Sequence, residues 1–212
     1  MSKPAKPKLK SASTIAVGEK SASQFIKRVF VEGRTHRAFG DEAVGEGLLR
    51  ELYEVVKFAP TASNTCPMRV SFVQSEAGKA KLLAAAAEGN RAKIASAPVT
   101  AIVAYDAEFY KYLHRLAPHL DAEKFARRDP AKLEAEGRAN AWLAGGFLIA
   151  AARGLGLDCG PMAGFDADAV NEAFYAGRSW RVIFLLNLGY GSGEGLYPRG
   201  ERLLWGEAVE VV

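Results

Sequence analysis

The chain has 212 residues, of which 49% are hydrophobic and 25% are charged, and these proportions are ordinary for one globular domain with appendages. It contains neither a run of about 18 apolar residues nor the apolar core of a secretory signal, which excludes a membrane-spanning protein and predicts a cytoplasmic location. Its two cysteines, Cys66 and Cys159, lie far apart in the sequence, which argues against a disulfide framework.

The net charge of +4 arises in the first 22 residues, which hold five lysines and one glutamate. Residues 23–212 are therefore electrically balanced. A folded domain that binds nucleic acid usually has a basic face of its own. We therefore predict a solvated Lys/Pro/Ser-rich leader over residues 1–22, a single domain over residues 23–212, and no nucleic-acid partner. A nucleic-acid binder driven by the leader is the alternative, and its affinity would fall steeply with salt.

Two helices are predicted at the start of the domain. Ser21 and Gln24 form a capping-box pattern, which predicts a helix that ends at Gly33. Apolar side chains at helical spacing then predict a second helix from about Asp41 to the residue before Pro60, because proline disfavours helix in the residue that precedes it.

Two strands with a capped helix between them are predicted next. "RVSFV" (69–73) alternates as a half-buried strand does, and "VTAIVAY" (99–105) is typical of a buried strand. Ser75 can cap an Ala-rich helix that runs through Ala86. Residues 106–130 are aromatic, charged and interrupted by prolines without one clean period, so we predict a lid or insert there.

The last part of the chain predicts two helices and a strand. A long helix over about 131–153 is rich in Ala and Gly, which lets another backbone approach closely and predicts a central or interface helix. Asp166 can cap the next helix, with Phe165 and Val170 at the positions of a hydrophobic staple. "WRVIFLLNLGYG" (180–191) is the most apolar strand. Because helices and strands do not alternate as βαβ units, the predicted fold class is α+β, a small sheet covered by helices.

Familiar catalytic and nucleotide motifs are missing from the sequence. "GLGLDCG" (154–160) follows a helix, and "GYGSGEG" (189–195) is not followed by one, so neither is a dinucleotide fingerprint. There is no P-loop, no H-E-x-x-H motif and no G-x-S-x-G elbow. His36, His114 and His119 do not form a zinc site with the cysteines at any familiar spacing. Any chemistry would therefore depend on a cofactor.

Three segments could build a cofactor site. "GRTHRAF" (33–39) places arginine forks and a hydroxyl after a helix stop, which suits a phosphate. "FAPTASNTCPMRVSFV" (58–73) supplies short hydroxyls, an amide and accessible backbone. "LDCGPMAGF" (157–165), interpreted as a loop, offers backbone N–H groups and little charge, and such a surface fits a flat, weakly polar ring. An ordinary loop is the alternative for each segment alone, so the hypothesis depends on their conjunction.

Four motifs, taken in order, resemble those of the flavin-dependent nitroreductase family. They are "RTHRAF", "APTASNTCPMRVSFV", "GLGLDCGPMAGFD" and "NLGYG" before an Arg-containing tail, and the resemblance covers about residues 24–205. It implies an α+β fold with a central, mainly antiparallel sheet flanked by helices, and a homodimer with a long interface helix and two shared FMN sites. Within the family, "APVTAIVAYDAEFY" and "GLDCGPMAGFD" are most similar to malonic semialdehyde reductases of the RutE type in pyrimidine degradation.

The resemblance also implies which residues bind FMN. Arg34 and Thr35 would hold the phosphate and the ribityl chain, with a second phosphate clamp from one of two tail arginines. The loop at residues 60–64 would reach the flavin of the partner subunit, and the backbone N–H of Ala163 would face N5 of the flavin. The full implied set is Arg34, Thr35, His36, Arg37, Pro60, Thr61, Ala62, Ser63, Asn64, Pro161, Met162, Ala163, Gly164, Arg199 and Arg202.

The implied activity is that of an FMN-dependent NAD(P)H oxidoreductase with ping-pong kinetics, which uses NADH or NADPH to reduce a small aldehyde acid such as malonic semialdehyde to 3-hydroxypropionate. A broad nitroaromatic or quinone reductase, or a flavin-binding protein without turnover, is the alternative. Gly33, Cys66 and Met68 depart from the family pattern, which counts against classical nitroaromatic reduction more than against FMN binding. No motif positions a side chain to protonate a product, so no catalytic residue is assigned.

Overall fold

The protein was analysed as a computed structural model, which describes residues 19–212, with side chains from residue 23 onward. The chain divides into two compact units, Met1–Gly33 and Arg34–Val212. The described part of the first unit consists of α1 (Glu19–Ile26) and a π-helical segment, η1 (Lys27–Val31). The expected helix is present. It begins two residues before Ser21, so the capping box predicted at that residue is wrong. The basic leader predicted for residues 1–22 lies, up to residue 18, outside the described residues.

A four-stranded sheet forms the centre of the second unit. Its strands are β1 (Met68–Val73), β2 (Val99–Asp106), β3 (Asp158–Met162) and β4 (Trp180–Gly189). They lie in the order β1-β2-β4-β3, and every neighbouring pair is antiparallel. This arrangement confirms the predicted α+β class with an antiparallel sheet, and it leaves β1 and β3 at the two edges.

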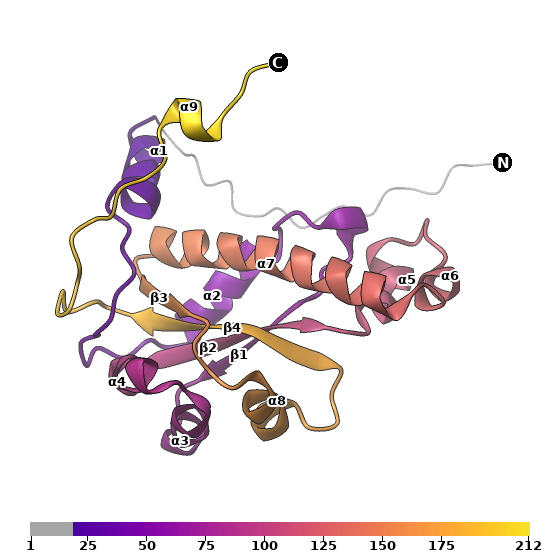
Figure 1. The fold of residues 1–212 in the computed structure, drawn as a ribbon, viewed down its shortest axis with the longest axis horizontal. Helices are drawn as coiled ribbons and strands as arrows, with labels where there is room; N and C mark the ends of the chain where they lie inside the picture. Colours follow the sequence, from indigo (N-terminus) through magenta and orange to yellow (C-terminus); the bar gives the residue numbers. More distant parts are fainter. Residues whose placement is uncertain (1–18) are drawn as a thin grey trace. The chain divides into compact units, whose positions relative to one another are not determined.

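Helices cover both faces of this sheet (Figure 1). One face packs against α2 (Glu46–Val56) and the long α7 (Pro130–Gly154), and the other face lies against α3 (Glu76–Ala85), α4 (Glu88–Ser96) and α8 (Ala167–Tyr175). Side chains of β2 alternate between the two layers: Val103 belongs to the core beneath α7, and Ile102 belongs to the opposite core. Both layers are buried, which explains why β2 is apolar at nearly every position.

The long helix predicted over residues 131–153 is confirmed as α7, and its small residues lie where it crosses the sheet. Asp129 caps it by accepting a hydrogen bond from the N–H of Ala131 at 2.8 Å. A Cβ atom on Gly145 would come within 2.7 Å of the Phe184 ring, so glycine permits the close approach of helix and strand. Trp142 and Leu143 of the same helix remain about half exposed. None of the helices in the described part of the chain is long and apolar enough to cross a membrane.

Several predicted boundaries need correction. The second helix begins at Glu46 and not near Asp41, because the chain before it is extended: Val44 is buried and its carbonyl accepts a hydrogen bond from Gln74 Nε2 at 2.8 Å. It ends at Val56, ahead of a turn. The helix caps at Ser75 and Asp166 are confirmed, since each accepts a backbone N–H of its own first turn, at 3.2 and 3.0 Å.

Several elements were not predicted. Residues 158–162, interpreted as a loop, form strand β3, and α4 precedes β2 where no helix was expected. The insert predicted at residues 106–130 contains η3 (Phe109–Tyr112), α5 (Leu113–Leu116) and α6 (Ala122–Ala126). Phe109 and Leu113 are fully buried, so the insert is anchored to the core. A short helix, α9 (Trp205–Ala208), lies in the exposed tail.

Candidate functional site

The turn at residues 34–37 lies along the edge strand β3. Thr35 forms a parallel bridge with Cys159, and the N–H of His36 donates to the Cys159 carbonyl at 2.9 Å. The chain that leaves β4 runs beside the same turn, because the N–H of Gly40 donates to the Tyr190 carbonyl at 2.8 Å. Three segments that are far apart in the sequence therefore meet in one place.

His36 packs inside this turn. Its Nε2 atom lies 3.4 Å from Oδ1 of Asp158, the first residue of β3, and its side chain is only 11% exposed. The N–H of Gly191 donates to the other carboxylate oxygen of Asp158 at 2.9 Å. A Cβ atom on Gly191 would overlap the imidazole ring, so only glycine fits there. His36 thus holds the turn against β3. Its contact with a cofactor stays a prediction.

Arg34 and Arg37 are held by the tail that follows β4. The Arg34 guanidinium donates to the Tyr197 carbonyl, and the guanidinium of Arg37 lies 4.8 Å from the centroid of the Tyr197 ring. The Arg34 carbonyl in turn accepts a hydrogen bond from Arg153 at 2.9 Å. Both cations are therefore positioned by backbone and ring contacts, which leaves their charges unneutralised by these partners.

Helix α4 adds two residues to this site that the sequence analysis missed. Burial, and secondarily the charge of Arg37, lower the pKa of Lys93. Lys93 donates to Asn90 Oδ1 at 2.7 Å, and Asn90 Nδ2 donates to the Gly164 carbonyl at 2.8 Å. No carboxylate contact is recorded for Lys93 or Arg37 within residues 19–212. Two neighbouring cations without an anion between them form a site that suits a phosphate or another anionic group.

A shallow apolar hollow lies beside the end of β3. It measures about 220 Å³ and is lined by Pro161, Met162 and Ala163 together with three side chains from α7 and β4, namely Trp142, Ile149 and Phe184. The rings of Trp142 and Phe184 are stacked at 4.7 Å. A flat, weakly polar group fits a hollow of this kind. Gly164 is held just beyond it, because its carbonyl also accepts the N–H of Ala87 at 3.1 Å.

The loop at residues 60–66 is strained. Ser63, Asn64 and Cys66 have φ values of 53°, 54° and 43°, in the left-handed region that residues other than glycine seldom adopt. Local hydrogen bonds maintain this shape: the N–H of Cys66 donates to Thr61 Oγ1 at 3.1 Å, and that of Ala62 donates to Asn140 Oδ1 at 2.7 Å. Backbone strain of this kind clusters at active sites and ligand-binding sites.

Within one chain, this loop does not lie beside the basic turn at residues 34–37. The loop contacts α7 at Asn140, whereas the turn contacts it at Arg153. Thirteen residues of helix separate the two positions, which corresponds to about 20 Å along the axis. The structure therefore places residues 34–37 beside the first residues of β3, the strand that leads into residues 161–164, and leaves residues 60–64 beside the middle of α7 (Figure 1).

The two tail arginines lie in an exposed segment. Arg202 donates to the carbonyls of Gly200 and Glu201 at 2.9 and 2.8 Å, so its recorded hydrogen bonds are local. The choice between Arg199 and Arg202 as a phosphate clamp stays open.

Neither a metal cluster nor a reactive Cys159 thiol is supported by the described residues. No group of three or more His, Cys, Asp or Glu side chains is close enough there to hold a metal ion. Burial raises the pKa of Cys159 to about 12, so this thiol is neutral near pH 7. The site is thus built for binding, and its chemistry depends on what it binds.

Comparisons with known proteins agree with this geometry. A family model described as "Nitroreductase family" matches residues 32–190. A protein of Ralstonia nicotianae, named as a candidate NADH dehydrogenase/NAD(P)H nitroreductase, is 46% identical over 187 residues, which cover 88% of this chain and 96% of that protein. A protein of Stenotrophomonas maltophilia with a name of the same kind is 49% identical over 187 residues, with 88% and 95% covered.

Solved structures share the fold. A candidate nitroreductase of Bacillus subtilis, ydfN, superposes with a TM-score of 0.79 at 23% identity and covers 92% of this chain and 100% of that chain. A candidate nitroreductase of Exiguobacterium sibiricum, solved in complex with FMN, superposes with a TM-score of 0.78 at 21% identity, covering 89% and 97%.

Proposed function

Because this chain belongs to the nitroreductase family, we propose that it is an FMN-dependent NAD(P)H oxidoreductase that acts as a homodimer. The observation that carries the proposal is the meeting of two unneutralised cations, Arg37 and Lys93, with a small-residue strand end and an apolar hollow. A solved protein of the same fold is a complex with FMN.

The residues present fit FMN. Arg34, Arg37 and Lys93 would bind its phosphate, because charge-assisted hydrogen bonds to an anion are the stronger class. Thr35, exposed in the same turn, offers a hydroxyl for the ribityl chain. The hollow at Pro161–Ala163 would hold the ring, and we assign the backbone N–H of Ala163 as a donor to it. Donors fixed by the backbone stabilise developing charge without reorganisation.

The chemistry that FMN supplies when bound is the transfer of a hydride from NAD(P)H to a second substrate. The chain's own part is to bind, orient and shield. His36 and Asp158 keep the basic turn in register with β3, and Asn90 holds Gly164 beside the hollow. No side chain is assigned as a proton donor, so the proton that completes reduction would come from solvent.

The homodimer is supported by the separation of the two half-sites. The strained loop at residues 60–64 contacts α7 near its middle, at Asn140, whereas the basic turn contacts it near its end, at Arg153, about 20 Å along the axis. A second copy packed against α7 would bring its loop to the first copy's basic turn. Trp142, Leu143 and Phe147 are about half exposed on α7, and such apolar surface favours association.

For the substrate, we propose malonic semialdehyde, on the resemblance of "GLDCGPMAGFD" to the enzymes that reduce it, and with it a role in pyrimidine degradation in the cytoplasm. A nitroaromatic or quinone is the second candidate, because the curated relatives are named for NAD(P)H nitroreductase activity.

The visible spectrum of the purified protein tests the proposal. We expect the absorption of oxidised flavin, saturation of the apoprotein by one FMN per chain, and bleaching by NADH or NADPH that malonic semialdehyde or a nitroaromatic reverses. Failure of saturating FMN to bind would refute the proposed function. Binding without bleaching would indicate a flavin-binding protein that does not turn over.

A further inference from the structure

A second and larger cavity lies on the other side of the strained loop. It measures about 710 Å³ and is bounded by the end of α2, the loop at residues 61–66, β1 and the insert that follows β2. Most of its lining is apolar or aromatic. Three cationic side chains, Lys57, Arg69 and Arg115, line it as well, and no Asp or Glu side chain of the described residues does. Cavities of this size commonly bind small organic ligands.

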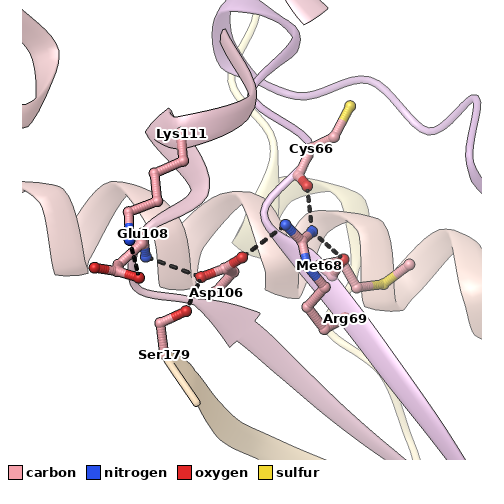
Figure 2. A network of polar contacts seen from close by, with 7 residues as sticks. All are labelled: Cys66, Met68, Arg69, Asp106, Glu108, Lys111 and Ser179. Atoms are coloured by element: carbon pink, nitrogen blue, oxygen red, sulfur yellow. Dashed lines mark hydrogen bonds and ion pairs between the residues drawn. The ribbon is translucent and has the colours of Figure 1, made fainter. Parts of the chain in front are cut away.

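The Arg69 guanidinium is fully engaged in contacts within the protein (Figure 2). Its guanidinium donates to Asp106 Oδ2 at 2.8 Å and to the carbonyls of Cys66 and Met68, both at 2.9 Å. The Asp106 side chain is only 3% exposed, and it also accepts a hydrogen bond from Ser179 Oγ at 2.6 Å. Arg69 therefore shapes the wall of the cavity, and its charge is neutralised.

Lys57 is also engaged, because it forms an ion pair with Glu54 on its own helix and lies 5.3 Å from the Phe58 ring centroid. Arg115 is different. It is exposed on α5, and no hydrogen bond, ion pair or ring contact is recorded for it in the described part of the chain. The cavity thus contains one guanidinium that is available to a ligand.

Aromatic side chains line the same cavity. Tyr112, one turn before Arg115, and Trp180, at the start of β4, both line the cavity, and both rings lie over Arg69 at 5.1 and 5.9 Å. Aromatic walls of this kind fit a planar carbon skeleton, and a planar guanidinium matches a carboxylate through two parallel hydrogen bonds.

We propose that this cavity binds the electrophilic substrate through a carboxylate, with Arg115 as the residue that recognises the carboxylate, and that its aromatic walls also accept planar acids. The inference rests on the proposed function, since the loop that lines the cavity at Thr61 and Asn64 is the one assigned to the flavin site. Malonic semialdehyde carries such a carboxylate, and a cavity of about 710 Å³ also has room for planar acids of the size of benzoate.

Calorimetric titration of the FMN-loaded protein, without NAD(P)H, tests the assignment. The probes are 4-nitrobenzoate and its neutral isostere 4-nitrobenzamide. We expect the wild type to bind the carboxylate about tenfold more tightly than the amide, and this ratio to fall to about one in Arg115→Gln. Arg127→Gln is the matched control, because Arg127 is an exposed arginine at the C-cap of α6 that does not line the cavity, and it should keep the ratio. Equal affinities in the wild type, or a preserved ratio in Arg115→Gln, would overturn the proposal.

Turnover separates this inference from the proposed function. With NAD(P)H present, the KM of the wild type should be lower for the carboxylate probe than for the amide probe. This difference should disappear in Arg115→Gln. Charge-selective binding without any NAD(P)H-dependent reduction would support the cavity and refute the enzyme. Reduction of both probes with no charge preference would support the enzyme and refute the role of Arg115.

Discussion

The Nε2 atom of His36 lies 3.4 Å from Oδ1 of Asp158, and the second oxygen of this carboxylate accepts the N–H of Gly191 at 2.9 Å. This pair thereby ties together the basic turn, the first residue of β3 and the chain that leaves β4. The position of the arginines in that turn depends on residues that need not touch a ligand. This dependence can be tested apart from ligand chemistry.

Gly191→Ala should disturb the turn, because the added Cβ atom would overlap the His36 ring. We expect the free energy of unfolding to fall by about 1–3 kcal/mol, the usual result of overpacking, and the affinity for FMN to fall with it. Gly47→Ala, at an open position in α2, is the control and should leave binding intact. Chemical denaturation and an FMN titration measure both effects, and an unchanged FMN affinity in Gly191→Ala would separate the turn from the cofactor site.

Lys93→Met should weaken FMN binding by about 10- to 100-fold if Lys93 binds the phosphate. Lys81→Gln on the neighbouring α3 is the control, because Lys81 contacts the Ala173 carbonyl and the Phe174 ring within the described part of the chain. Equal FMN affinities of the two variants would remove Lys93 from the site.

The pH dependence of the same lysine has a definite sign. Burial and the charge of Arg37 lower the pKa of Lys93, so the folded apoprotein binds fewer protons than the unfolded chain between the lowered pKa and the ordinary 10.5. Stability of the apoprotein therefore rises with pH in that window, whereas FMN affinity falls as Lys93 loses its charge. Lys93→Met should remove both trends and stabilise the apoprotein near pH 7. Thermal melts and FMN titrations over that range measure them.

The sequence predicts this fold well where one pattern dominates, as in β2 and α7, and fails where local chemistry contradicts the outcome. Asp158, Gly160 and Pro161 are poor strand formers, yet they belong to β3. Proline is tolerated because β3 is an edge strand. Glycine is needed there because a Cβ atom on Gly160 would lie 2.6 Å from the His36 carbonyl. Both reasons depend on tertiary contacts, so the local sequence pattern does not indicate them.

The candidate site was predicted only in part, for the same kind of reason. Arg34 and Arg37 stand out in the sequence because they flank a hydroxyl in a short turn. Asn90 and Lys93 do not, since they are spaced as on any helix face and α4 has little amphipathic pattern. Lys93 comes close to Arg37 only in the folded chain. The available signal in the sequence was a polar helical segment just before a buried strand.

The buried pair of Arg69 and Asp106 should be far more costly to break than a surface pair (Figure 2). Arg69→Met leaves a buried carboxylate without its cation, and we expect a loss of about 3–5 kcal/mol in the free energy of unfolding. The double variant Arg69→Met/Asp106→Leu should recover part of that loss. Arg127→Gln, which removes an exposed pair with Glu123, should lose less than about 1 kcal/mol. Urea unfolding ranks the variants, and a double variant less stable than either single one would contradict this account.

The two cysteines should react at different rates. Burial raises the pKa of Cys159 to about 12, so at pH 8 only about one thiol in 10,000 is ionised, and the side chain is fully buried. Cys66 is partly exposed beside the larger cavity. We expect a thiol reagent at pH 8 to modify one cysteine in the native protein and the second only after denaturation. Peptide mapping should identify Cys66 as the first, and the loss of native reactivity in Cys66→Ser is the control.

The exposed apolar residues of α7 test the homodimer. Leu143 is 47% exposed beside Trp142, which is 46% exposed, and burial of such side chains in an interface stabilises it by about 25 cal/mol per Å² of apolar surface. Leu143→Arg would place an unpaired charge in the proposed interface, so we expect the protein to become a monomer that has also lost FMN, because the proposed homodimer divides the two half-sites between its chains. Light scattering with the flavin spectrum measures both properties at once. Lys132→Glu, an exposed charge change on the same helix outside the apolar patch, is the control. A wild-type protein that is monomeric and still holds FMN would show that one chain completes the site alone.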